Sequence, residues 1–382
     1  MLRAPLASER ITMIDPTTGI KVVQLTSYPV PSWNLLYNWP SVTPDNRRVV
    51  FTSQRYAGRT APWDVWRCDT DGLNLFQLTD RGDEPQTLPP TAALGPDGES
   101  VYSVWHHDCV FCRIDLETGR LEELCDLMPL RGSERASFGY MAFSPSGRHA
   151  FLARFAVPVS SGCVKIDLAT GVADTIDLGG LFTGCDQARG RLAFMASPQD
   201  VGVIERPDGT RMLGRTDPAS SDMWTTDEEG GDPRFLCPNL FAHYAFVGKT
   251  SAMQGCGRPP ERCIWFCEEG KDPEKLVQGP YFWHSGPSFD GEWIVADTNW
   301  PDMGLQLVHV PTRHFRTLCH PRASLGHPQE GHPHPSLSRD GRVAVFGSDR
   351  TGVRQVYVAY VTDEFRESVK AGELDNPRDK WI

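Results

Sequence analysis

Ser338-Arg339-Asp340-Gly341, followed by the apolar run Val343-Ala344-Val345-Phe346, is the stretch that decides the fold. A Ser-x-Asp-Gly loop favours a tight turn, and the apolar run after it has the length of a strand. The unit recurs about every fifty residues, the period expected of β-propeller blades. Clear copies of the loop lie at residues 43–46, 95–98, 144–147 and 288–291, and weaker copies at 187–190 and 247–250.

Each unit also carries a second strand–turn–strand signal. Ile114-Asp115-Leu116-Glu117-Thr118-Gly119 is one copy, and residues 166–171 repeat it in kind. Asp and Gly at such positions are turn residues between strands. Seven units, each giving a four-stranded sheet, predict an all-β chain folded as a seven-bladed β-propeller.

The two ends of the chain each hold part of a unit. The chain opens with a copy of the second hairpin at residues 14–26, and its partner first hairpin is Val343–Val361 at the other end. We therefore expect the N-terminal strand to complete the last blade and lock the ring. This interpretation makes residues 1–382 a single propeller domain, with the charged residues 363–382 as a tail or short helix outside it.

Composition limits the partners and the compartment. The net charge of −11 argues against nucleic acid or an anionic membrane as a partner. No segment is long and apolar enough to span a bilayer, and residues 1–10 lack the apolar core of a secretory signal. The eleven cysteines are odd in number and scattered, which favours reduced thiols in a cytoplasm. Cys109 and Cys112 have the spacing of half a zinc site, but we expect a strand over Trp105–Ile114, where they would face opposite sides.

The innermost strand of each blade lines the central channel of a propeller. We compare the residue six positions before the loop Asp, or its equivalent, in each unit. In chain order these residues are Trp39, Thr91, Tyr140, Thr183, His243, His284 and His334. Three consecutive blades thus carry histidine at one aligned position. A slip of one residue in the weak fifth unit would turn His243 away from the channel.

Further potential ligands lie just before the last loop. His332 and His334 are two residues apart, so in a strand they point to the same side; Gln329 joins them only if the chain bends. Imidazoles suit Mn, Fe, Ni, Zn or Cu, and an amide oxygen favours the harder of these ions. The pattern predicts a metal site of His284, Gln329, His332 and His334 with His243 nearby. Four ligands leave positions open for water or substrate, as in catalytic sites. The alternative is a set of histidines hydrogen-bonded around channel water.

These residues resemble the oligogalacturonate lyases, seven-bladed propellers of the polysaccharide lyase class. The run Gln329-x-x-His332-x-His334-Pro335-Ser336 is similar to that family's metal motif. The run His284-Ser285-x4-Asp290-Gly291 is similar to the segment with its remaining histidine ligand, and Ala242-His243-Tyr244 falls where the family carries its Brønsted base. The resemblance covers the whole chain in repeat order and spacing, and it is strongest in the second half.

The resemblance implies a metal-dependent lyase that acts on short acidic oligosaccharides, as in pectin degradation. A uronate would present its C6 carboxylate to a divalent metal, manganese in this family, and the metal would acidify the adjacent C5 proton. His243 would take that proton, because an imidazole is close to neutral at physiological pH. The C4–O bond would then break by β-elimination.

One position departs from the family pattern. The family has an arginine next to a Met-Trp pair that assists catalysis, whereas Met223-Trp224 is preceded here by Asp222. Arg154, Arg55 and Arg350 follow expected strands and are candidates to bind a second carboxylate bidentately. The alternative for each is an arginine satisfied at a blade edge or in solvent.

Two aromatic residues are further candidates for substrate binding, and two other functions also fit the sequence. Trp39 and Tyr140 are candidate sugar-stacking platforms, and channel packing explains them equally well. The change at Asp222 favours a related metal-dependent enzyme acting on a different uronate or sugar. The repeats alone also fit a non-enzymatic binding propeller similar to the periplasmic TolB type, because a fold does not fix a function.

Overall fold

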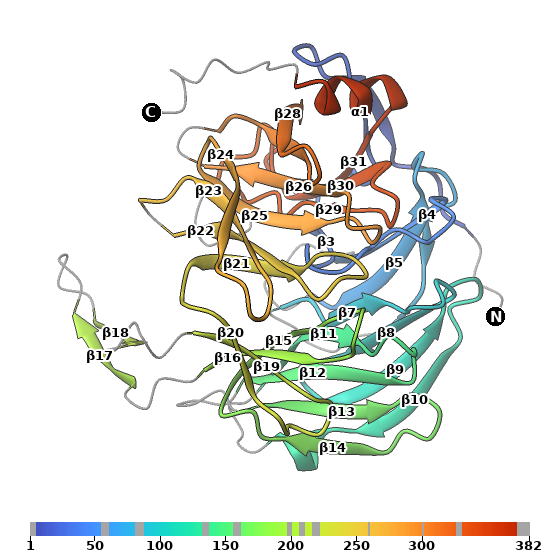
Figure 1. Cartoon of the computed structure of the whole chain (residues 1–382). Coiled ribbons are helices and arrows are strands. Elements are labelled where there is room, and N and C mark those ends of the chain that lie inside the picture. The colour runs from blue at the N-terminus through green and yellow to red at the C-terminus, as the bar shows by residue number, and fades with distance from the viewer. Residues whose placement is uncertain are drawn as a thin grey trace.

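Seven antiparallel sheets follow one another around a central axis and form a β-propeller (Figure 1). This confirms the predicted fold class. The computed structural model describes residues 5–54, 61–80, 88–131, 137–155, 162–196, 201–205, 211–215, 222–258, 260–299, 302–325 and 331–372, with only the backbone for 201–205 and 211–215.

The first four blades are described here from the innermost strand outward. Blade 1 has β3 (Ser32–Asn34), β4 (Arg48–Gln54), β5 (Trp63–Asp69) and β6 (Phe76–Gln77). Blade 2 has β7 (Thr91–Leu94), β8 (Ser100–Val104), β9 (Val110–Asp115) and β10 (Leu121–Asp126), followed by the 3-10 turn η1 (Met128–Leu130). Blade 3 has β11 (Ser137–Phe143), β12 (His149–Phe155), β13 (Cys163–Asp167) and β14 (Ala173–Ile176). Blade 4 has β15 (Gly180–Cys185), β16 (Leu192–Ala196), β19 (Met223–Thr226) and β20 (Arg234–Cys237).

The last three blades continue the ring. Blade 5 has β21 (Phe241–Phe246), β22 (Met253–Gly257), β23 (Cys263–Cys267) and β24 (Glu274–Gln278). Blade 6 has β25 (Phe282–Pro287), β26 (Trp293–Thr298), β27 (Leu305–His309) and β28 (His314–Cys319). Blade 7 has β29 (Ser336–Leu337), β30 (Val343–Ser348) and β31 (Gln355–Tyr360), then β2 (Lys21–Gln24) and β1 (Ile11–Ile14).

The N-terminal residues close the ring as predicted. Strand β2 pairs antiparallel with β31, with Val23 opposite Val358, and β1 adds a fifth strand on the outside. The Asp15 carboxylate accepts the backbone N–H of His320 at 2.9 Å, which ties the N-terminal hairpin to the end of blade 6. Both ends of the chain therefore contribute to blade 7 and its neighbour.

The repeated loop works through side-chain hydrogen bonds to the backbone. Ser338 Oγ accepts the N–H of Val343 at 3.0 Å and donates to Asp340 Oδ1 at 2.8 Å. Gly341 has φ +71°, the left-handed region that favours glycine. The same Ser–Asp–Gly geometry recurs before β26, so the local turn chemistry explains why the motif marks each blade.

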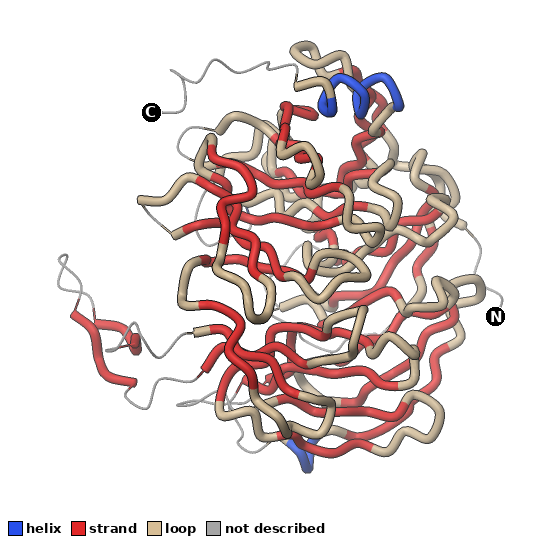
Figure 2. The backbone as a smooth tube through the Cα atoms, in the orientation of Figure 1, coloured by secondary structure: helices blue, strands red, loops and turns tan. Residues whose placement is uncertain are grey.

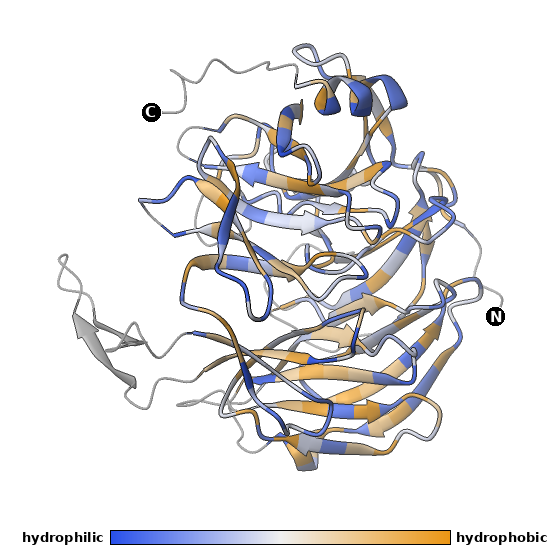
Figure 3. Cartoon of the chain, viewed as in Figure 1, coloured by the Kyte–Doolittle hydropathy of each residue, from blue (hydrophilic) through white to orange (hydrophobic). Residues whose placement is uncertain are grey.

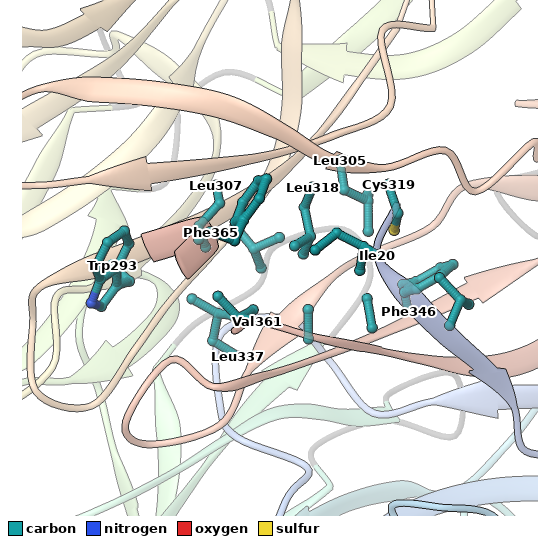
Figure 4. Packing of buried hydrophobic residues seen from close by; sticks show 14 of the residues in the cluster. Ile20, Trp293, Leu305, Leu307, Leu318, Cys319, Leu337, Phe346, Val361 and Phe365 are labelled. Atoms are coloured by element: carbon teal, nitrogen blue, oxygen red, sulfur yellow. The ribbon is translucent and has the colours of Figure 1, made fainter. Parts of the chain in front are cut away.

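Apolar side chains from neighbouring sheets fill the space between blades. Figure 3 shows hydrophobic and hydrophilic residues alternating along many strands, the period expected of a sheet. Figure 4 shows the cluster between blades 6 and 7, where Leu307 lies across from Leu337 and Val361, with Trp293 and Phe346 at its two ends. Helix α1 (Asp363–Lys370) covers this cluster with Phe365. Residues 363–370 thus form the expected short helix, and residues 373–382 lie outside the described part.

Three details differ from, or add to, the sequence analysis. The prediction of one strand over Trp105–Ile114 is wrong. Strand β8 ends at Val104, a turn follows in which Cys109 has φ +56°, and β9 begins only at Val110. All eleven cysteines have free thiols. The hairpin of β17 (Val201–Glu205) and β18 (Arg211–Arg215), an insertion in blade 4 that the repeat does not predict, extends away from the ring (Figure 2).

Among the described helices, we find none with the length and apolarity needed to cross a membrane.

Candidate active site

Irregular backbone marks one level of the channel in four neighbouring blades. The pairing of innermost strands β11, β15, β21 and β25 with the next strand shifts register near this level. Tyr140, Ala242 and His284 fall at these shifts. A bulge re-aims side chains and is frequent beside active sites. The fold therefore interrupts its ladders where the sequence analysis aligned its channel residues.

Four histidines come together at this level from three consecutive blades. The ring centroid of His284 lies 4.2 Å from that of His243, 4.0 Å from that of His334 and 5.6 Å from that of His332. His284 is fully buried, and His332 is 1% exposed. The predicted base and three of the four predicted ligands are thus neighbours. Gln329, the fourth, lies outside the described residues.

The segment that carries His332 and His334 is not the strand we expected. Strand β29 begins only at Ser336, and His334 has φ +46°, which is uncommon for any residue but glycine. The two rings are 6.0 Å apart and close to parallel, at 28°. They gather through a local turn of the backbone rather than through the two-residue period of a strand. Left-handed residues outside glycine concentrate at functional sites.

Asp297, at the end of β26, holds two of the histidines in place. Its carboxylate accepts His284 Nδ1–H at 2.9 Å and the backbone N–H of His284 at 2.7 Å. It also accepts the backbone N–H of His334 at 3.2 Å, across the boundary between blades 6 and 7. Because Nδ1 of His284 donates to Asp297, its Nε2 carries the lone pair. That Nε2 is buried and has no hydrogen-bond partner within the described part of the chain.

A buried arginine supports the other side of the cluster. Arg354, 4% exposed, donates from Nη1 to the carbonyl of His332 at 2.5 Å and from Nη2 to Asn34 Oδ1 at 3.0 Å. Asn34 Nδ2 in turn donates to the carbonyl of His334 at 2.7 Å. A Cβ on residue 347 would lie 2.5 Å from Arg354 Nη2, so Gly347 leaves the space that the guanidinium fills. Neither Asp297 nor Arg354 was identified from the sequence.

Blade 1 contributes Tyr37 rather than Trp39 to the histidine level. In this blade Asn34 pairs with Phe51, and the next pair is Val42 with Val49. Only one residue on β4 separates these two pairs, so residues 35–41 make an excursion from the strand. The Tyr37 ring lies 5.5 Å from that of His284 and nearly parallel to that of His334, at 6.5 Å and 12°. Because of this excursion, the residue six positions before the loop Asp is not at the histidine level in blade 1, and the sequence alignment therefore chose Trp39 instead of Tyr37.

Trp39 lies elsewhere in the channel. Its ring packs 5.3 Å from Phe143 and 6.1 Å from Phe289, and its Nε1 donates to the carbonyl of Leu94 at 2.7 Å. It lines a small cavity of about 40 Å³ with Phe246 and Phe289. This is the channel packing that the sequence analysis kept as an alternative.

Burial favours the neutral form of His243, His284 and His334. It lowers the pKa of His243, and it lowers the pKa values of His284 and His334 well below the ordinary range, with Arg354 acting in the same direction on the last two. Burial also raises the pKa of Asp297 to about 6, against the opposing effect of the His284 N–H. Above that pH the site holds an ionised Asp297 beside these neutral imidazoles.

His243 is oriented by the neighbouring blade. Its ring donates to the backbone carbonyl of Trp283, and the Trp283 ring lies edge-on at 4.9 Å. Its Nδ1 is buried and has no hydrogen-bond partner among the residues described. The geometry therefore leaves Nδ1 able to accept a proton from a group placed in the channel.

The remaining candidates occupy different places. Arg154, on β12, donates to the carbonyl of Leu130 at 3.4 Å, and Tyr140 packs 5.6 Å from Phe155. Burial raises the pKa of Tyr37 well above its ordinary value, and the charge of an ionised Tyr140 would act in the same direction.

Arg350 and Asp222 make their described contacts away from the histidine level. Arg350 lies over the Tyr357 ring at 4.6 Å and donates to the carbonyl of His320 at 3.4 Å, in blade 7. Asp222 accepts the backbone N–H of Asn239 at 3.1 Å on the link into blade 5. Arg55 lies outside the described residues.

The donor set fits a divalent metal in its chemistry. No group of three or more His, Cys, Asp or Glu side chains in the described ranges is arranged to hold a metal ion. The buried, unpartnered Nε2 of His284 is nevertheless the expected ligand atom, because metal-binding histidines usually donate their other N–H to a carboxylate, as His284 does to Asp297. The rings of His332 and His334 lie next to that of His284, at centroid distances of 5.6 and 4.0 Å.

No protein-family model matches the chain, and no curated protein matches it. Solved structures do. An oligogalacturonate lyase in complex with manganese matches with a TM-score of 0.74 at 18% identity, over 96% of this chain and 100% of that chain. The chain has the propeller fold of these lyases. The oligogalacturonate lyase from Vibrio parahaemolyticus matches with a TM-score of 0.72 at 17% sequence identity, over 96% of this chain and 100% of that chain. A puromycin-hydrolyzing peptidase from Mycobacterium tuberculosis gives 0.51 at 16%, over 91% of this chain and 58% of that chain.

Proposed function

We propose that this protein is a metal-dependent lyase that cleaves short uronate-containing oligosaccharides, of the oligogalacturonate type, by β-elimination. The observation that carries the proposal is the cluster in which His243 lies beside His284, where Nδ1 of the first and Nε2 of the second are buried and have no hydrogen-bond partner among the described residues. The likeness in fold to two oligogalacturonate lyases, one of them a manganese complex, supports it.

His284, His332, His334 and Gln329 are the residues that would hold the metal, with manganese as the proposed ion. When bound, a divalent metal supplies Lewis-acid polarisation of a carboxylate, which acidifies a proton on the adjacent carbon. Asp297 keeps the lone pair of His284 on Nε2, and Arg354 and Asn34 hold the backbone that carries His332 and His334. These supports fix the ligand rings before substrate arrives.

His243 is the proposed base. Burial lowers its pKa, so at neutral pH the imidazole is uncharged and Nδ1 can take the C5 proton of a uronate. The C5–H electron pair then forms the C4–C5 double bond and the C4–O bond breaks. The departing oxygen takes a proton from solvent to give the new hydroxyl, and His243 returns the C5 proton to solvent, so no net proton is consumed. No water is added, and the product is an unsaturated uronate.

Short substrates suit the charge of the chain. The net charge of −11 repels a long polyanion, whereas one or two carboxylates can be met by local positive groups. Arg154 remains the proposed partner of a second carboxylate, with Tyr140 beside it in blade 3 and Arg55 as a further candidate. We place the enzyme in the cytoplasm, because eleven free thiols suit a reducing compartment.

The test is an absorbance assay with digalacturonate and Mn²⁺, with and without chelator, at about 235 nm, where the conjugated uronate product absorbs. The proposal expects a rise that chelator abolishes. A flat trace with manganese bound would reject this substrate and favour another uronate. A flat trace without bound metal would reject the metal-dependent lyase and favour a binding propeller.

A further inference from the structure

A groove beside the histidine cluster runs between blades 1 and 2. It has a volume of about 170 Å³. Trp33 and Leu36 form one side, Pro89 and Pro90 the other, and Asn34 and Thr91 supply polar atoms. Ligand sites are mostly apolar concavities with a few placed polar groups, so this lining has the composition of a binding site.

Apolar side chains at this groove are exposed to solvent. Leu36 is 40% exposed, and Leu88, next to Pro89 in the chain, is 58% exposed. Large apolar residues grouped at a concave surface indicate a ligand groove more strongly than the same residues scattered singly. The excursion of residues 35–41, which brings Tyr37 to the histidines, is also what presents Leu36 here.

One residue belongs both to the groove wall and to the support of the histidine cluster. Asn34 lines it and donates to the carbonyl of His334 at 2.7 Å. The Arg354 guanidinium lies over the Trp33 ring at 5.0 Å and so places a positive charge next to the groove wall. Asn34 and Arg354 therefore form a boundary that the groove and the histidine cluster share.

We propose that this groove is a sugar subsite, which holds the pyranose ring next to the reacting uronate. The inference rests on the proposed function. A pyranose has C–H faces that pack on aromatic and aliphatic side chains and a rim of hydroxyls. Thr91 Oγ1 donates to the carbonyl of Phe138 at 2.8 Å, which leaves its lone pairs for a sugar hydroxyl. The groove is smaller than the roughly 300–1,000 Å³ of drug-sized pockets, so it fits one ring rather than a chain.

The test compares Leu36→Asp with Leu73→Asp. Leu73 is a matched control, since it is 38% exposed and lies on the turn between β5 and β6. With digalacturonate and Mn²⁺, Leu36→Asp is expected to raise KM roughly fivefold or more while kcat stays within about twofold, because the lost contact is made equally in ground and transition states. Leu36→Ala should act in the same direction with a smaller effect. An unchanged KM in both Leu36 variants would overturn the subsite and leave the lyase proposal standing.

A binding arm separates this inference from the proposed function. Calorimetry in chelator, where no turnover occurs, compares digalacturonate with the galacturonate monosaccharide. The subsite predicts tighter binding of the disaccharide by the wild type and by Leu73→Asp, and loss of that preference in Leu36→Asp. If the wild type shows no turnover, the lyase proposal fails, and this arm still decides the groove: a preference lost in Leu36→Asp supports it, and no preference in the wild type rejects it.

Discussion

Two halves of the channel carry different chemistry at the same strand position. In blades 2 and 4 the hydroxyls of Thr91 and Thr183 are satisfied locally, by the carbonyl of Phe138 at 2.8 Å and by Met223 Sδ at 3.6 Å. In blades 5 and 6 the aligned His243 and His284 each keep a buried nitrogen without a hydrogen-bond partner among the described residues. In blades 2 and 4 the threonine O–H groups are used as donors within the protein, whereas blades 5 and 6 each leave a ring nitrogen without a partner among the described residues.

The backbone does not make this difference. Blades 3 to 6 all shift register near this level, yet only blades 5 and 6 present an imidazole there. The open nitrogen of His284 exists because Asp297 occupies the other one. The comparison teaches that the propeller supplies the position, and that a residue type together with one supporting carboxylate supplies the chemistry.

The largest effect is expected at the base. His243→Ala should reduce kcat by about 10²- to 10⁴-fold, the usual contribution of a positioned proton acceptor, and should keep bound manganese. Thr183→Ala, at the aligned position of blade 4, should leave kcat within about twofold. Absorbance at the product band and elemental analysis measure both. Loss of manganese from His243→Ala would make that residue a ligand and leave the base unassigned.

Removal of a ligand comes next. His284→Ala should abolish stoichiometric manganese and activity together, because it deletes the ring that Asp297 orients. His309→Ala is the control in the same blade, since His309 bonds Thr312 at 2.9 Å rather than facing the channel. Metal content after dialysis is the readout. Full manganese content in His284→Ala would contradict the assignment of the metal site.

A smaller effect tests the supporting carboxylate. Asp297→Asn keeps the shape but not the charge, and we expect manganese to bind about 10- to 100-fold more weakly, the usual consequence of losing such a support. High manganese should restore much of the activity, which a ligand deletion would not allow. Titration of activity against free Mn²⁺ measures the shift. Unchanged manganese affinity in Asp297→Asn would show that this carboxylate does not support metal binding by His284.

The smallest effect is expected at Asp222, outside the cluster. Asp222→Ala removes the acceptor for the Asn239 N–H and should lower the free energy of unfolding by about 0.5–1.5 kcal/mol. Its kcat should match the wild type, because no described contact links it to the histidines. Thermal unfolding and the absorbance assay check both parts. A large fall in kcat without a stability change would give Asp222 a part in the chemistry.

Local patterns predicted the fold well, for a physical reason. The Ser338 and Asp340 bonds that shape the loop are made within six residues, so the sequence displays them, and seven copies imply seven blades. The shared position of His243, His284 and His334 followed from the same alignment.

Features set by irregular backbone or distant pairing could not be predicted in this way. Tyr37 replaces Trp39 because residues 35–41 leave the strand, and His334 turns through φ +46° where a regular strand was expected. Arg354 and Asp297 act across blade boundaries. Asp297 did leave a signal, a carboxylate in the apolar strand Trp293–Thr298, whereas the β17–β18 insertion simply breaks the repeat.

An anomalous-difference map from crystals grown with Mn²⁺ would locate the metal without reference to activity. The account predicts one strong peak bounded by the rings of His284, His332 and His334, on the side of the channel that faces His243. A peak elsewhere, or none at saturating manganese with ordered histidines, would contradict the account.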